Sequence, residues 1–242
     1  MRYQNCIFDL YGTLADIHTD EDSPRLWGRM AGLYAQYGAS YRPGELQSSY
    51  RRLVRELEGG ETLRQDAHEA HPEIQIEQVF RRLYEEKGAD SSPELTARTG
   101  LAFRRWSTEY LRLYPGAAEL LVRLRAGGRR LWLLSNAQSL FTRRELDQLK
   151  ISHLFDGIYL SSDCGCKKPD PRFFQLLLRQ QAIDPKTAVM VGNDGACDIE
   201  GAQAVGLATV YIRSNISPIE PVPKADYVLS SMELRQVEKL LM

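Results

Sequence analysis

The sequence predicts an α/β protein in which a Rossmann-like parallel sheet has helices on both faces and carries a separate helical domain. Short apolar runs alternate with helical patterns from about residue 128 to the end of the chain, which is typical of a parallel sheet covered by helices. A further apolar run occupies residues 3–9. Between these two parts, residues 15–113 have helical spacing and almost no strand pattern.

Each apolar run is short and bounded by polar or turn residues, so we expect a buried strand at residues 3–9, 130–134, 157–160, 188–191, 209–212 and 227–229. The segments with helical spacing are residues 138–150, 173–181, 198–205 and 232–241. Pro171 suits the first turn of the second of these helices. Together these elements predict a core domain made of residues 1–14 and 114–242.

The inserted domain is expected to contain four helices rich in Arg and Glu, near residues 24–37, 44–58, 76–87 and 94–112. Their charged residues indicate solvated outer faces. Tyr114-Pro115-Gly116 is typical of a turn that starts a new helix. The helical domain is therefore assigned to residues 15–113, directly after the first strand.

Composition excludes several classes of protein. The 242 residues are 43% hydrophobic and 26% charged, which is enough for a core and a charged surface. The 31 basic residues balance 32 acidic ones, so the charge favours neither a nucleic acid nor a membrane partner. No apolar run approaches the roughly 20 residues that span a bilayer, and Asp9 interrupts the first run, so we expect no signal peptide. The four cysteines suggest no disulfide framework, which predicts a reducing, cytoplasmic setting.

Polar residues follow four of the apolar runs, at the carboxyl ends where active sites of open parallel sheets lie. They are Asp9 with Gly12 and Thr13, then Ser135-Asn136, then Lys168 in a Lys-Pro-Asp-Pro run, and finally Asn193, Asp194 and Asp198. A carboxylate such as Asp9 can displace a leaving group from phosphorus or carbon and form an ester that water then hydrolyses. Alone, each group also fits an ordinary structural role, such as a helix cap, a polar turn or a solvated lysine.

Taken in this order, the four groups resemble the motifs of the haloacid dehalogenase-like (HAD) hydrolase superfamily over residues 3–14 and 114–230. The resemblance implies that the helical domain is a cap that closes over the site, with hinges at residues 14–18 and 110–116. It implies that Asp9 is the nucleophile and that Lys168 neutralises Asp9 and the substrate anion. Its remaining implications are substrate contacts by Thr13, Ser135, Asn136 and Lys168, and a Mg²⁺ site made by Asp9, the Tyr11 carbonyl, Asn193, Asp194 and Asp198.

Two residues depart from the phosphatase pattern of that family. Tyr11 stands where most of its phosphatases have a second Asp that acts as the general acid, and Asn193 stands at the first acid of the fourth motif. General acid catalysis typically contributes about 100- to 10,000-fold, and a Tyr with a pKa near roughly 10 donates poorly at neutral pH. Tyr11 remains a catalytic candidate, and its presence predicts a preference for good leaving groups such as acyl or aryl phosphates.

Three functions follow from these observations. The preferred one is a magnesium-dependent phosphatase that forms an aspartyl-phosphate intermediate on a small phosphorylated metabolite, with low efficiency. The alternative is a 2-haloacid dehalogenase, which uses an Asp nucleophile and no metal. Dehalogenases of the family carry Asp-x-Tyr-Gly-Thr as this chain does, but their fourth motif is shorter and they have a Tyr where Phe174 stands here. The third is a binding or regulatory protein with little turnover. The sequence leaves open the substrate, its cap contacts, the oligomeric state and the importance of Cys164 and Cys166.

Overall fold

A six-stranded parallel sheet forms the centre of the core in the computed structural model, which describes residues 3–59, 72–218 and 221–242. Its strand order is β5-β4-β1-β6-β7-β8, and every neighbouring pair is parallel. The strands are β1 (Asn5–Phe8), β4 (Arg130–Ser135), β5 (Gly157–Leu160), β6 (Ala188–Gly192), β7 (Ala208–Ile212) and β8 (Tyr227–Leu229). All six lie within one or two residues of their predicted positions, so the predicted fold class is confirmed.

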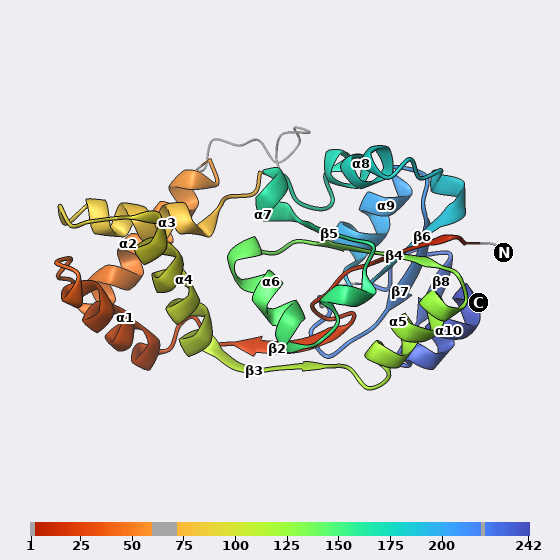
Figure 1. Cartoon of the computed structure of the whole chain (residues 1–242), viewed down its shortest axis with the longest axis horizontal. Coiled ribbons are helices and arrows are strands. Elements are labelled where there is room, and N and C mark those ends of the chain that lie inside the picture. Colours follow the sequence, from red (N-terminus) through yellow and green to blue (C-terminus); the bar gives the residue numbers. More distant parts are fainter. Residues whose placement is uncertain (1–2, 60–71, 219–220) are drawn as a thin grey trace.

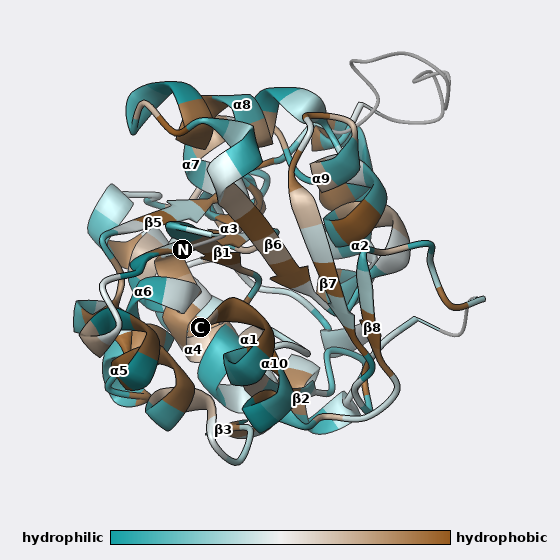
Figure 2. Cartoon of the chain, turned by 90° about the vertical axis from the view of Figure 1, so that its right-hand side faces the viewer, coloured by the Kyte–Doolittle hydropathy of each residue, from teal (hydrophilic) through white to brown (hydrophobic). Residues whose placement is uncertain are grey.

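Helices cover both faces of this sheet (Figure 2). Successive side chains of a strand point to opposite faces, so Phe8 packs with the apolar residues of α5 (Ala117–Ala126) and α10 (Leu234–Leu241). Ile7 packs instead with those of α8 (Pro171–Gln180). The remaining core elements are α6 (Ser139–Gln148), η2 (Ser152–Leu154), α7 (Ser161–Cys164), η3 (Pro185–Thr187), η4 (Gly195–Glu200) and α9 (Gly201–Gln203).

Four helices lie together at the other end of the molecule (Figure 1). They are α1 (Pro24–Gln36), α2 (Pro43–Leu57), α3 (Ile76–Glu85) and α4 (Pro93–Ser107), close to the predicted segments. All four contribute aromatic side chains to a shared apolar core, among them Trp27, Tyr50, Phe80 and Phe103, and the ring centroids of their contacting pairs lie 5.2–5.9 Å apart. This helical part therefore has an apolar core distinct from the clusters packed on the sheet, and Phe141 of α6 packs into it. Within the described residues, no helix has both the length and the apolar character that crossing a bilayer requires.

A two-stranded antiparallel ribbon joins the two parts, and the sequence did not predict it. It consists of β2 (Ala15–Thr19) and β3 (Thr108–Leu113). The expectation of a helix through residue 112 is wrong, because α4 ends at Ser107. The two strands stabilise each other by pairing, although the inserted helices separate them in the sequence. The spacing of apolar residues within each strand does not reveal such a long-range pairing. The helix expected at 198–205 also begins earlier, as the single π-helical turn of η4.

Candidate active site

The site forms at the carboxyl ends of the three central strands. Asp9 follows β1, which lies between β4 and β6 in the sheet. Ser135 ends β4 and Asn193 follows β6, so the parallel arrangement brings these residues beside Asp9. A cavity of about 200 Å³ opens there, lined by Asp9, Tyr11, Ser135, Asn136, Lys168, Asn193, Asp194, Cys197, Asp198, Ile216 and Pro218. Of the predicted site residues, only Thr13 is absent from this lining, and its hydroxyl lies beside Asp9.

The two carboxylate oxygens of Asp9 have different surroundings. Oδ1 accepts hydrogen bonds from Lys168 Nζ at 2.8 Å and from Ser135 Oγ at 3.1 Å. Oδ2 has only a long contact of 3.4 Å, from Thr13 Oγ1, among the described residues. Oδ2 is therefore the oxygen better placed to attack a substrate, while Oδ1 is held in position.

Lys168 connects Asp9 to Asp198 of the fourth motif. Its ammonium group donates to Asp9, to Asp198 Oδ1 at 2.6 Å and to the Leu134 carbonyl at 2.9 Å. The side chain is buried, which alone would lower its pKa, but Asp198 and Asp9 hold the pKa of Lys168 above its ordinary value. Lys168 therefore stays charged at neutral pH. The Asn136 side chain bonds both the N–H and the carbonyl of Lys168, at 2.7 and 2.9 Å, so it positions this lysine.

Asp198 is the most deeply buried carboxylate of the site. Oδ1 accepts from Lys168 and Oδ2 accepts from the Asp194 N–H at 3.0 Å. Burial, together with the charge of Asp9, raises the pKa of Asp198 to about 6 despite the neighbouring ammonium. A Cβ at Gly192 would lie 2.2 Å from Asp198 Oδ2, so glycine is required at the end of β6 for this carboxylate to enter.

Gly12 allows the first and fourth motifs to meet. Its φ is +86°, and a Cβ there would lie 2.3 Å from Asn193 Nδ2. The close approach lets Thr13 Oγ1 donate to Asn193 Oδ1 at 3.2 Å. Asn193 thus lies beside Asp9, and the Thr13 hydroxyl is close to both side chains. Asp194 caps η4 instead, because its Oδ1 accepts the Cys197 N–H at 2.7 Å.

The donors of this site fit a hard cation that takes few ligands from the protein. Among the residues that the structure describes, three carboxylates, of Asp9, Asp194 and Asp198, line the cavity against one ammonium group, which leaves an excess of negative charge. Within the described ranges, no three His, Cys, Asp or Glu side chains form a ready metal cluster. Mg²⁺ usually takes one or two carboxylates and keeps several waters. Asp9, with oxygens of Asn193 or Asp194, supplies such a set.

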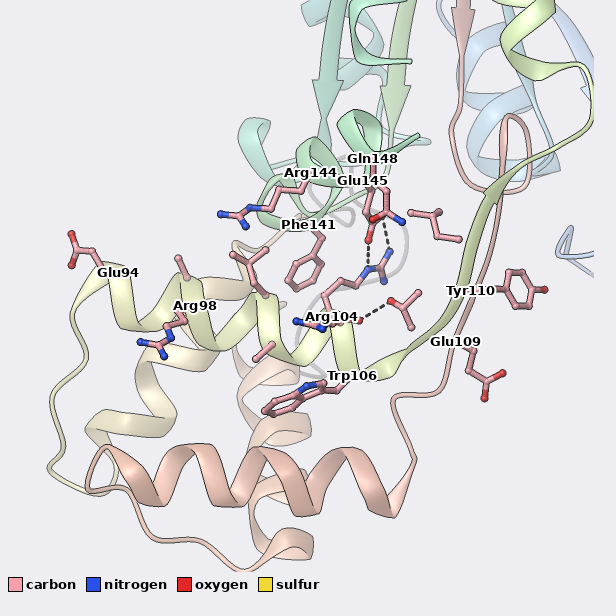
Figure 3. Close-up of a pocket in the computed structure, with 16 residues that line it drawn as sticks. Glu94, Arg98, Arg104, Trp106, Glu109, Tyr110, Phe141, Arg144, Glu145 and Gln148 are labelled. Carbon is pink, nitrogen blue, oxygen red and sulfur yellow. Dashed lines mark hydrogen bonds and ion pairs between the residues drawn. The ribbon is translucent and has the colours of Figure 1, made fainter. Parts of the chain in front are cut away.

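Tyr11 lines the cavity, but its hydroxyl is bound to the core helix α6. It donates to the Glu145 carboxylate and lies 3.0 Å from Thr142 Oγ1. Burial and the nearby Glu145 raise the pKa of Tyr11 above its ordinary value. Glu145 is bound in turn by Arg104 of the helical part, through Nε at 2.6 Å and Nη2 at 3.3 Å (Figure 3). Tyr11, two positions after Asp9, is therefore connected through Glu145 to the helical part.

Sequence reasoning missed Glu145, Thr142 and Arg104. In the sequence, Glu145 lies among charged residues of an amphipathic helix, a pattern that indicates a solvated position. No local signal distinguishes it from its neighbours. The groove beside this contact has a volume of about 870 Å³ and lies between α4, β3 and α6 (Figure 3). It is separate from the cavity that contains Asp9.

Comparison with known proteins establishes the family. A family model described as haloacid dehalogenase-like hydrolase matches residues 3–206, so the chain belongs to that family of hydrolases. Phosphoserine phosphatase of Thermus thermophilus is 34% identical over 161 residues, which cover 66% of this chain and 63% of the relative. Glyceraldehyde 3-phosphate phosphatase of Methanopyrus kandleri is 33% identical over 134 residues, covering 55% and 58%. The chain thus spans less than two thirds of the length of these two relatives.

One dehalogenase aligns over more of the chain. The (S)-2-haloacid dehalogenase 4A of Burkholderia cepacia is 28% identical over 218 residues, which cover 89% of this chain and 85% of the relative. Among solved structures, a 2-haloacid dehalogenase of Pseudomonas syringae superposes with a TM-score of 0.69 at 22% identity, covering 99% and 98%. A HAD phosphatase of Thermococcus onnurineus superposes with a TM-score of 0.61 at 21% identity, covering 98% and 97%. These structural likenesses establish the fold alone.

Proposed function

We propose that this protein is a magnesium-dependent phosphatase that transfers a phosphoryl group from a small monoester to Asp9. The observation that carries the proposal is the excess of negative charge around a buried, charged Lys168. A site of this charge needs a bound cation before it can accept a phosphate dianion, and phosphoryl transfer is catalysed mainly by positioning and charge neutralisation. The similarity to two phosphatases supports the same reaction.

In this mechanism Asp9 Oδ2 attacks the phosphorus atom, and the bond from phosphorus to the leaving-group oxygen breaks with its electron pair on that oxygen. Lys168 holds Oδ1 and offsets charge on the transferred group. Water then attacks the aspartyl phosphate, which restores the Asp9 carboxylate. One proton of this water stays on the released phosphate and the other passes to solvent. A Mg²⁺ ion held by Asp9 and Asn193 or Asp194 would supply further charge neutralisation.

Tyr11 is poorly suited to be the acid of this reaction. Its proton is donated to Glu145 and its pKa is raised, so it cannot readily protonate an alkoxide. The proposal therefore includes a preference for substrates whose leaving group departs without a proton, such as aryl phosphate esters and acyl phosphates, which are mixed anhydrides. Low efficiency on alkyl phosphates follows from the same geometry.

A 2-haloacid dehalogenase is the second candidate, favoured by Tyr11 and by the dehalogenase that aligns over 89% of the chain. Halide leaves without a proton, so Tyr11 would be no disadvantage. However, the substrate carboxylate would enter a cavity in which three carboxylates face one ammonium group. In the absence of a cation, like-charge repulsion opposes that binding.

The test is a panel of aryl phosphates, acetyl phosphate, alkyl phosphates and 2-haloacids, each assayed with MgCl2 and with EDTA. We expect phosphate release that requires Mg²⁺ and rises steeply as the leaving group becomes less basic. Halide release in EDTA without phosphate release would establish the dehalogenase instead. Release of neither product would favour a binding or regulatory role. The Asp9→Asn variant is the control for a contaminating phosphatase.

A further inference from the structure

The segment that follows strand β7, residues 213–218 and here named the β7 loop, contributes to the lining of the cavity that contains Asp9. Among the described residues, this loop supplies Ile216 and Pro218, the two aliphatic side chains in the lining. Of the part of the chain that the structure describes, the helices α1–α4 contribute no residue to that lining. The group attached to a phosphate at Asp9 would therefore meet the β7 loop before it met any of these four helices.

The β7 loop is fixed on its inner side to the fourth motif. Ser217 Oγ accepts the Ser214 N–H at 3.0 Å, which closes the turn. Asn193 Nδ2 lies 3.4 Å from the same Ser217 oxygen. The turn therefore sets Ile216 and Pro218 relative to Asn193 and the nucleophile.

Asn215 fixes the outer side of the loop to the ribbon that leads to the cap. Its Oδ1 accepts the Tyr114 hydroxyl at 2.5 Å, and its Nδ2 donates to Asp16 Oδ1 at 3.0 Å. Asp16 also accepts two hydrogen bonds from Arg112, at 2.8 and 3.0 Å. These hydrogen bonds hold the β7 loop in a fixed position, which a loop that selects among substrates requires.

We propose that the β7 loop determines specificity, and that Ile216 and Pro218 select monoesters with a small apolar or aryl leaving group. This proposal rests on the phosphatase function proposed above. The charged end of the cavity, at Asp9 and Lys168, accepts the phosphate, so the leaving group lies toward the apolar wall. The volume of about 200 Å³ is below the roughly 300–1,000 Å³ of typical ligand pockets, which favours a small leaving group. Ile216 keeps 37% of its surface exposed, available for such a contact.

The test compares the binding of phenylphosphonate and methylphosphonate to the full chain by calorimetry in MgCl2. We expect phenylphosphonate to bind about tenfold more tightly, because the ring covers apolar surface of the wall. Ile216→Asn should remove most of this preference and leave methylphosphonate binding unchanged. Val222→Asn is the matched control, because Val222 is also exposed and lies four residues beyond the loop, outside the cavity lining. This control should retain the preference.

Two results would overturn the proposal. One is a wild-type protein that binds the two phosphonates equally or binds neither. The other is an Ile216→Asn variant that keeps the wild-type preference. Turnover is measured separately on phenyl phosphate. If no phosphate is released while the binding preference and its loss in Ile216→Asn are observed, the phosphatase function fails and the specificity wall stands.

Discussion

Replacing Glu145 with Gln tests whether the helical part is held to the core by the contacts of Glu145 with Arg104 and Tyr11. Glu145 lies between Arg104 of α4 and Tyr11 of the active-site turn, and it bonds both. The side chains of Arg104 and Glu145 are only 17% and 10% exposed. Glu145→Gln keeps the shape of the side chain and removes its charge. It leaves the Arg104 guanidinium without its counterion in a mostly buried position.

The expected cost follows from this burial. Breaking a fully buried pair costs about 3–5 kcal/mol, whereas an exposed pair contributes about 0–1 kcal/mol. The pair is closer to the buried limit, but Gln still accepts a hydrogen bond, so we expect the free energy of unfolding to fall by about 2 kcal/mol. A double-mutant cycle with Arg104→Met should give a coupling energy of about 1–2 kcal/mol.

The assay is urea unfolding of the wild type, the two single variants and the double variant. Arg143→Met is the matched control, because Arg143 lies on the same helix and pairs with Asp163 at 55% and 40% exposure. We expect Arg143→Met to lower the free energy of unfolding by about 0.5 kcal/mol or less. A coupling energy no larger than the effect of Arg143→Met would refute the link between cap and core.

Tyr11→Phe separates this anchoring role from acid catalysis. If the Tyr11 hydroxyl only anchors the helical part, its loss should lower kcat/KM by a similar factor for aryl and alkyl phosphates, because closure of a cap over the site would precede both reactions. A general acid would instead show a selective loss on the alkyl esters, whose leaving groups need a proton. The second result would contradict the assignment of the Tyr11 hydroxyl to Glu145.

Three further predictions concern the nucleophile, the metal and the ribbon. Asp9→Asn should abolish turnover while the circular dichroism spectrum is retained. Residual activity would contradict the assignment of Asp9 as the nucleophile. Asn193→Asp should tighten Mg²⁺ binding by about tenfold in calorimetry, since a charged ligand replaces a neutral one. Unchanged binding would show that residue 193 is not a ligand of the metal. Burial would raise the pKa of Asp16, but hydrogen bonds from Asn215 and Arg112 hold it below its ordinary 3.8. The stability from Asp16 is therefore present above pH 3.8 and lost as the pH falls through the lowered value. Asp16→Asn should lower the free energy of unfolding by about 1 kcal/mol at pH 7. In urea unfolding at a series of pH values, this difference from the wild type should vanish at the acid end. A difference that does not change with pH would contradict the prediction.

The sequence by itself determined the sheet and the residues at its carboxyl edge. Each core strand is a short apolar run, and Asp9, Ser135 and Asn193 each stand at or just after the end of one. Parallel strands place such positions at one edge of the sheet, so their proximity could be predicted without coordinates. Lys168 was found through its Lys-Pro-Asp-Pro context.

Only the tertiary structure decided how these residues are partnered. Tyr11 meets Glu145, which is 134 residues away in the chain, and β2 pairs with β3 across the inserted domain. Such contacts are stabilised by charge pairing, burial and cross-strand hydrogen bonds, and these depend on neighbours in space. Local spacing reports only which face of an element is apolar. For that reason Tyr11 could be identified from the sequence as a departure from a catalytic acid, but its bond to Glu145, and through Glu145 to the cap, could not.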